Sequence, residues 1–370
     1  MTGIVSTVLY LLIVFSCFGL SKSYSANNRI SNETHSNLSL PLVLVFSSAF
    51  TIFNIFCTSN ETEWRGDRLQ YFRDYNGRKV DSFLSFIIDF VKYHFDSFEL
   101  LLYSTTFICC MLIFLAYRNS KQADAYCLLA FMCTDTILYS YTRLKQAYAI
   151  AIAILLLTIV MNNQLTIKRL LVSVLLLYIL CGFHVSGYIM IPLFIFIWLF
   201  KDKKINIYLV LLIILILFIS FQPFLIGLAK IIEPILPGLT NKINDYFTED
   251  SLKIGEGSLL YFIKGIPYYF FLISGLLCRK KLSSKIQNYD IYLTIVMCCS
   301  LSFVISLWSY WMKRTSAYFC FASIEFGITL IRNFDNNKLR MYSYYSVLFY
   351  FAFLLIRYFY QSFSIYGGLI

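Results

Sequence analysis

Charged residues are scarce in this sequence. Only 14% of its 370 residues are Asp, Glu, Lys or Arg, whereas soluble domains contain about 25%. Hydrophobic residues make up 59%, above the roughly 45–50% of soluble domains, so the composition excludes a soluble globular protein. In a soluble protein the net charge of +11 would point to nucleic acid. Here the positions of the basic residues along the chain indicate membrane orientation instead, and we expect no nucleic-acid partner.

The motifs of common soluble enzymes are also absent. The sequence has no P-loop, no Gly-x-Ser-x-Gly element, no His-Glu-x-x-His element and no dinucleotide-binding fingerprint. It has three histidines and no Cys-x-x-Cys pair, so no spacing typical of a metal site occurs. We therefore expect neither a metal nor a cofactor. Nearly all of the eleven cysteines lie inside apolar runs, where they act as small hydrophobic residues.

Long apolar runs dominate what is present. A helix needs about 20 mostly apolar residues to cross a bilayer. The runs lie at 4–20, 40–57, 98–117, 124–141, 146–161, 170–182, 186–200, 205–222, 258–278, 289–309, 315–331 and 341–360. They predict an all-α, polytopic membrane protein with about twelve transmembrane helices. The first run is interpreted as a retained span because nothing basic precedes it, and 170–200 also fits one hairpin broken around Gly182 and His184.

The basic residues of alternate loops predict the orientation. One set of loops carries 16 basic and 5 acidic residues, and the other set carries 13 of each. By the positive-inside rule the first set is cytoplasmic and both termini are outside. The two longer loops, 58–97 and 223–257, then lie on the extracytoplasmic side, where we expect the working face of a single multi-pass domain over 1–370.

Within the first long loop, residues 80–98 predict an amphipathic helix that lies on the membrane. Its apolar positions are Phe83, Phe86, Ile87, Phe90 and Val91. Its charged positions are Asp81, Asp89, Lys92 and Asp96.

The segment from Trp64 to Tyr75, in the same loop, is the strongest polar cluster. It holds three arginines, two aspartates and two tyrosines. Arg can bind a phosphate with two hydrogen bonds, Asp can orient a sugar hydroxyl, and Tyr can stack on a sugar face. A solvated loop beside the membrane is an equally good interpretation.

Two short outer turns also carry cations, Arg143 with Lys145 and Lys313 with Arg314. Basic residues in short outer turns run against the positive-inside trend. If a helix begins near Arg143, its N-terminal amides add to the cations in holding a phosphate. Anchoring to lipid headgroups is the competing interpretation.

His184 lies at the outer end of an apolar hairpin, between Gly182 and Gly187. An ionisable group in such a place is a functional candidate, and a hydrogen-bonded interior histidine is the alternative. Four more charged residues lie within predicted spans, where charge is costly and usually paired. They are Asp135, Glu325, Lys264 and Arg357.

Four short elements together resemble the EpsG/Wzy-type polysaccharide polymerases of bacterial O-antigen, capsule and exopolysaccharide assembly. They are Arg65-Gly66-Asp67 with Tyr71, Lys145-Gln146-Ala147-Tyr148-Ala149, Phe183-His184-Val185-Ser186, and Arg314 with Tyr318-Phe319. Their order and spacing match over about residues 60–330. Two departures stand out: the glycine directly precedes Asp67, and Lys145 occupies the usual Arg position with Arg143 two residues earlier.

The resemblance implies a fold similar to the C-type glycosyltransferases, in the bacterial cytoplasmic membrane, with the active site facing the periplasm. It also implies polyprenyl-diphosphate-linked oligosaccharides as substrates, membrane lipid as surroundings, and room for a chain-length regulator protein as partner. We expect His184 or Asp67 to orient or deprotonate the acceptor hydroxyl. The expected diphosphate-binding residues are Arg65, Arg143 or Lys145, and Arg314, and the expected sugar-binding residues are Tyr71, Gln146 and Tyr318.

Three other functions fit the same features. A C-type glycosyltransferase that adds a single sugar is compatible with the acidic first loop, but such enzymes generally show an Asp-x-Asp or Glu-x-Asp pair. An O-antigen ligase differs only in its acceptor. A flippase or transporter for lipid-linked sugars would also use about twelve helices, with shorter loops and internal repeats.

Overall fold

A computed structural model describes residues 3–29, 38–58, 67–77, 82–134, 136–162, 166–201, 203, 206–219, 227, 230–231, 233–234, 262–306 and 312–366. Helices joined by turns account for these residues, and no strand occurs among them, so the predicted all-α class is confirmed. Two compact units divide the chain: unit 1 is Met1–Trp198 with Ile331–Ile370, and unit 2 is Leu199–Leu330.

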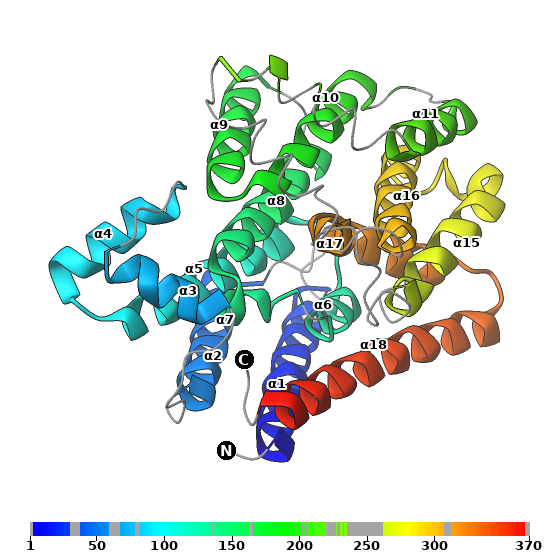
Figure 1. The fold of residues 1–370 in the computed structure, drawn as a ribbon. Coiled ribbons are helices and arrows are strands. Elements are labelled where there is room, and N and C mark those ends of the chain that lie inside the picture. The colour runs from blue at the N-terminus through cyan, green and yellow to red at the C-terminus, as the bar shows by residue number, and fades with distance from the viewer. Residues whose placement is uncertain are drawn as a thin grey trace. The chain divides into compact units, whose positions relative to one another are not determined.

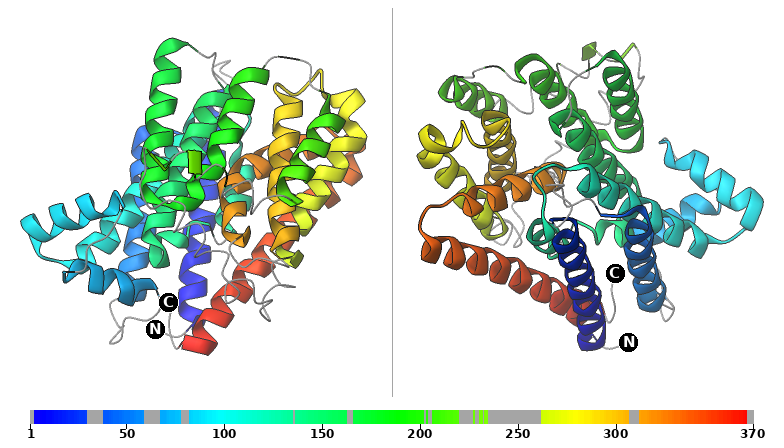
Figure 2. Two further views of the ribbon diagram at one scale, coloured as in Figure 1. Left: turned by 45° about the horizontal axis from the view of Figure 1, so that its top comes forward. Right: turned by 180° about the vertical axis from the view of Figure 1, so that it is seen from behind.

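Unit 1 is built around a row of packed helices (Figure 1). Its elements are α1 (Gly3–Arg29), α2 (Leu40–Thr58), α3 (Asp67–Tyr75), α4 (Leu84–Phe95), α5 (Phe98–Asn119), α6 (Ala125–Met132), α7 (Tyr139–Thr142), α8 (Leu144–Asn162), α9 (Ile167–Phe183), the 3-10 helix η1 (Val185–Ile189), α10 (Met190–Phe200) and α18 (Asn337–Tyr366). Helix α2 packs on α5, α5 on α8 and α8 on α9, while α18 packs against α1 and α6 (Figure 2).

Helix α8 forms the centre of unit 1. Beyond its first turn it is apolar on all sides, as expected for a helix surrounded by other helices. Alanines at alternate positions of its first half bring neighbouring backbones close, and these are Ala147, Ala149, Ala151 and Ala153. All four are buried. Helix α9 beside it exposes Leu171, Leu175 and Tyr178, so one face of α9 is outside the core.

Side-chain caps fix where several of these helices begin. The Ser97 hydroxyl accepts from the Leu100 amide and starts α5, and the Asp124 carboxylate accepts from the Cys127 amide and starts α6. Each cap satisfies one of the helix N–H groups that have no partner within the helix. Asp124 also pairs with Arg332, which joins the start of α6 to the region before α18.

Unit 2 contains α11 (Ile207–Ile219), α15 (Ile266–Leu282), α16 (Tyr289–Ile305) and most of α17 (Met312–Arg332). Helix α16 packs against α11 and α15. It also holds α17, because Thr315 donates to the Ser302 hydroxyl at 3.1 Å and the Tyr292 ring stacks on Phe326 at 5.9 Å.

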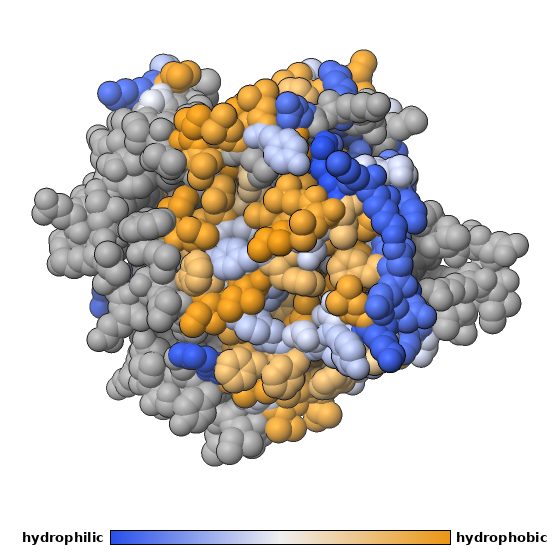
Figure 3. All heavy atoms as spheres, turned by 90° about the vertical axis from the view of Figure 1, so that its right-hand side faces the viewer, coloured by the Kyte–Doolittle hydropathy of each residue, from blue (hydrophilic) through white to orange (hydrophobic). Residues whose placement is uncertain are grey.

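Apolar side chains cover much of the outside. Figure 3 shows a broad apolar surface on the side where α15 lies, bordered by a hydrophilic band. Ile266, Ile273 and Leu277 of α15 are exposed, as expected for a helix in contact with lipid.

Three described helices are long and apolar enough to cross a membrane: Phe98–Asn119, Leu144–Met161 and Asn337–Arg357. Five shorter apolar helices accompany them, and the number of twelve spans stays a prediction.

One predicted helix is wrong. The apolar run at 124–141 contains two short helices, α6 and α7, instead of one. Thr134 donates to the Phe131 carbonyl at 2.7 Å, and Ser140 donates to the Ile137 carbonyl at 2.8 Å. Such local bonds from Ser and Thr compete with the helical pattern of the backbone.

The amphipathic helix of the first loop exists as α4, but the predicted apolar face is only partly right. Its buried residues are Leu84, Ile88 and Val91. Phe86 and Phe90, which we expected on the same face as Val91, are 70% and 57% exposed. Helix α4 therefore has two apolar stripes, one packed on the protein and one pointing outward.

Candidate active site

Helix α3 carries the end of the first polar cluster and lies against α4 and the start of α5. The rings of Phe72 and Tyr75 pack edge-on against Phe98, with centroids 5.3 and 5.7 Å away. Lys92 of α4 donates to the Tyr75 carbonyl oxygen at 2.8 Å and lies 5.5 Å from the centre of the Tyr75 ring. These contacts hold α3 in place, and Tyr71 is left only 8% exposed.

The Tyr75 hydroxyl closes this network by donating to Asp96 at 3.4 Å. Burial, together with the negative charge of Asp96, raises the pKa of Tyr75. Asp67 is the first residue of α3. Arg65 and the side chain of Asp67 lie outside the described residues, so their predicted roles stay predictions.

Lys145 connects the second motif element, residues 145–149, to the first, which contains Tyr71. Its Nζ lies 6.0 Å from the centre of the Tyr71 ring, at the outer limit of a cation–π contact. Lys145 is in the first turn of α8, where helix N–H groups also face outward. A cation, an aromatic face and a helix N-terminus therefore meet at this end of α8.

Arg143 immediately precedes α8 and faces a different partner. Its guanidinium carbon lies 4.8 Å from the centre of the Tyr139 ring on α7. Its backbone carbonyl accepts from the Ala147 amide at 2.8 Å, so the helix begins where the sequence indicated. Lys145, by contrast, faces Tyr71.

The third element is a break in the chain at His184, as predicted. Helix α9 ends at Phe183, His184 is extended with φ −151° and ψ 132°, and η1 follows. Gly182 packs closely on Phe83, because an added side chain at this position would meet the Phe83 ring and would force that ring to shift. The Phe83 amide donates to the Gly182 carbonyl at 3.0 Å, which attaches the start of α4 to this break.

The hydrogen bonds of His184 assign its tautomer. Its Nδ1 accepts from the Ser186 amide at 3.1 Å and lies 2.7 Å from the Ser186 hydroxyl. A backbone N–H can only donate, so Nδ1 carries the lone pair and the proton of the neutral ring is on Nε2. In this tautomer the N–H donor of the His184 ring is on Nε2, and the part of His184 in the reaction stays a prediction.

The second and third elements meet directly. The ring of Tyr148 stacks on that of Phe183, with centroids 4.6 Å apart and planes 15° apart. The Tyr148 hydroxyl donates to Thr105 of α5 at 3.3 Å. Unit 1 thus brings together three elements that span more than a hundred residues of the sequence, from Tyr71 to His184. This stack was not predicted, although Tyr148 lies in the motif at 145–149 and Phe183 in the motif at 183–186.

The other predicted site residues lie as follows. Gln146 is buried beneath the first turn of α8, and Tyr318 is buried on α17. Sugar binding by these two side chains stays a prediction. Their burial argues against it, because a sugar must reach the side chain to contact it. Arg314, also on α17, is half-buried and belongs to unit 2.

Metal ligands do not gather in the described part of the chain: no three His, Cys, Asp or Glu side chains lie close enough to hold an ion. The ten cysteines described are free thiols. Most are buried in apolar helices.

Helices that are long and apolar enough to cross a bilayer, together with shorter apolar ones, indicate a membrane protein. The chain belongs to the EpsG family, whose model matches residues 42–368. No curated protein and no solved structure matches it. The match covers all four of the elements that carried the resemblance.

Proposed function

We propose that this protein polymerises polyprenyl-diphosphate-linked oligosaccharide repeat units into a surface polysaccharide on the outer face of the bacterial cytoplasmic membrane. Membership of the EpsG family supports the reaction class. The observation that carries the proposal is the meeting of Tyr71, Lys145 and the Phe183–His184 break around one end of α8.

The reaction transfers a growing glycan from one lipid carrier to the next repeat unit. A sugar hydroxyl of the acceptor attacks the anomeric carbon of the donor, that carbon's bond to the diphosphate oxygen breaks, and the polyprenyl diphosphate leaves. Fixed positive charge near the leaving group lowers the barrier, because negative charge builds up there in the transition state. Lys145 and Arg143 supply it at the start of α8, with Arg65 and Arg314 as the further proposed contacts.

The hydrogen bonds of His184 suggest which residue binds a substrate oxygen and which removes the acceptor proton. With Nδ1 occupied by Ser186, its Nε2–H is suited to hold an oxygen of the acceptor sugar or of the diphosphate. Removal of the acceptor proton then falls to Asp67, a carboxylate at the first position of α3. Tyr71, whose ring faces Lys145 but is only 8% exposed, is the proposed sugar-binding residue and would contact the sugar through its exposed edge.

Glycan gels of cells that carry single variants test the proposal. Arg143→Ala, Lys145→Ala and Arg314→Ala should each abolish long chains while single capped units remain. Lys168→Ala, which removes an exposed lysine at the start of α9, is the matched control and should leave the ladder unchanged. Normal ladders from all three site variants would contradict the proposal.

Two further experiments separate it from its rivals. Vesicles supplied with lipid-linked repeat units on the outer face alone should form polymer, which a flippase would not do. Addition of EDTA should leave this activity intact, whereas a metal-dependent single-sugar transferase would lose it. Transfer to an acceptor other than a repeat unit would indicate a ligase.

A further inference from the structure

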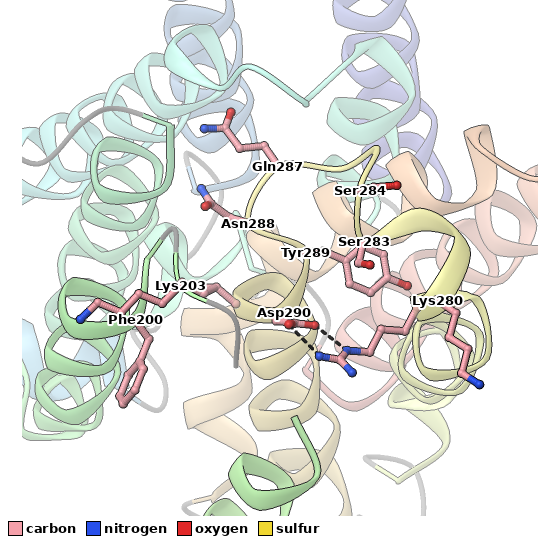
Figure 4. Close-up of a pocket in the computed structure, with 11 residues that line it drawn as sticks. Phe200, Lys203, Lys280, Ser283, Ser284, Gln287, Asn288, Tyr289 and Asp290 are labelled. Carbon is pink, nitrogen blue, oxygen red and sulfur yellow. Dashed lines mark hydrogen bonds and ion pairs between the residues drawn. The ribbon is translucent and has the colours of Figure 1, made fainter. Parts of the chain in front are cut away.

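A second candidate binding site lies in unit 2, away from the motif residues of unit 1. It is a cavity of about 620 Å³ between the end of α15, the start of α16 and the chain around residue 203 (Figure 4). This volume is within the roughly 300–1,000 Å³ range of small-molecule sites. Its walls include Lys203, Lys280, Ser283 and Ser284, all of them exposed, so the cavity opens at the surface.

The charge of this cavity is positive. Three basic residues and one acidic residue line it. Asp290 pairs with Arg279 through two hydrogen bonds of 2.7 and 2.9 Å, which neutralises both. Lys203 and Lys280 lie on either side of this pair in Figure 4, and no carboxylate among the described residues pairs with them. In Figure 4 their amines point away from the pair and from each other, and these long, exposed side chains can turn toward an anion between them.

Neutral donors complete the lining. Ser283, Ser284 and Gln287 contribute hydroxyl and amide groups, and the first turn of α16 adds the partial positive charge of a helix N-terminus. The ring of Tyr289 forms a fixed apolar wall, because its hydroxyl donates to the Gly275 carbonyl at 2.6 Å. Lysine charges, hydroxyls and amides around one cavity are the groups that bind a phosphate.

We infer that this cavity binds a phosphate-bearing ligand on the predicted cytoplasmic side of the membrane. Lys203 and most of the other lining residues belong to the loops 201–204 and 279–290, which the positive-inside rule places there. The phosphate is that of an anionic lipid headgroup or of a small soluble compound. The site is independent of the proposed polymerase reaction, whose residues lie in other loops.

Two probes distinguish the sources in purified protein. Titration calorimetry measures binding of inorganic pyrophosphate, and native mass spectrometry measures retention of phosphatidylglycerol. The test variant is Lys203→Gln with Lys280→Gln, and the control is Lys168→Gln with Lys338→Gln, which removes the same charge from exposed positions of unit 1. Both carry Arg143→Gln and Lys145→Gln, which removes the proposed outer phosphate site from the measurement.

We expect the test variant to bind one probe about tenfold or more weakly than the control does, since two charge-assisted contacts are lost. Loss of pyrophosphate binding identifies a soluble ligand, and loss of phosphatidylglycerol identifies a lipid. Equal binding of both probes by test and control variants would overturn the inference. Equal melting temperatures of the two variants show that the comparison concerns binding alone.

Discussion

The ring of Tyr148 lies flat on the ring of Phe183, 4.6 Å away, and so joins the first turns of α8 to the end of α9. This contact places the start of the buried central helix beside the break at His184. The geometry of the candidate site therefore depends on a pair of aromatic residues that neither binds phosphate nor transfers a proton.

Removal of this stack should destabilise the protein. Phe183→Ala deletes a nearly buried ring and should cost about 3–5 kcal/mol of unfolding free energy. Tyr148→Phe keeps the stack and loses only the 3.3 Å bond to Thr105, which should cost about 0.5–1.5 kcal/mol. Thermal melting of the purified protein measures both, and equal losses would show that the stack contributes nothing.

His184 should act as a hydrogen-bond donor. His184→Ala should lower the polymerisation rate by about a hundredfold, the typical effect of losing one donor to a developing charge. His184→Gln should recover part of that rate, because the amide of Gln also donates. The dependence of the rate on pH should keep its acidic limb in His184→Gln. Disappearance of that limb would instead identify His184 as the base.

The outward stripe of α4 should contact lipid. Phe86, Phe90 and Tyr93 recur at helical spacing and are 70%, 57% and 85% exposed. Aromatic residues are typical of the membrane–water interface. A photoreactive benzoylphenylalanine at position 90 should therefore cross-link to lipid, whereas the same group at the exposed Asn76 should not. Cross-linking to protein alone from position 90 would contradict this placement.

The stability of the first loop should fall at high pH. The folded state raises the pKa of Tyr75 above its ordinary value of 10.0, so the phenol holds its proton more tightly when folded than when unfolded. Its contribution is fully present below pH 10.0 and is lost as the pH rises through the folded value.

Tyr75→Phe isolates this effect, since it keeps the ring on Phe98 and removes the bond to Asp96. The wild type should melt at a higher temperature than Tyr75→Phe at pH 8, and the difference should shrink or reverse near pH 11. A difference that stays constant with pH would exclude a role for this proton.

The sequence predicted the helices best where apolar runs are long. The run at 98–117 became α5, and the break at His184 was expected because glycines flank an ionisable residue in an apolar hairpin. It failed at 124–141, because a run of apolar residues does not reveal that Thr134 and Ser140 bond to the local backbone.

Three of the four predicted elements meet in unit 1, but the contacts between them could not be predicted from the sequence. Lys145 and Arg143 were equivalent in the sequence, and only tertiary packing directs Lys145 toward Tyr71 and Arg143 toward Tyr139. The inward face of α4 was misassigned for a related reason. Periodicity shows that apolar stripes exist, but the neighbours of the helix decide which stripe is buried.

The bond from the Phe83 amide to the Gly182 carbonyl has an entropic consequence. It ties the long first loop to the core near its middle and so divides one large closed segment into two smaller ones. The cost of closing a loop rises with its length. Because this ordering is completed when the protein folds, less of it remains to oppose substrate binding, and the groups around α8 are already arranged when a ligand arrives.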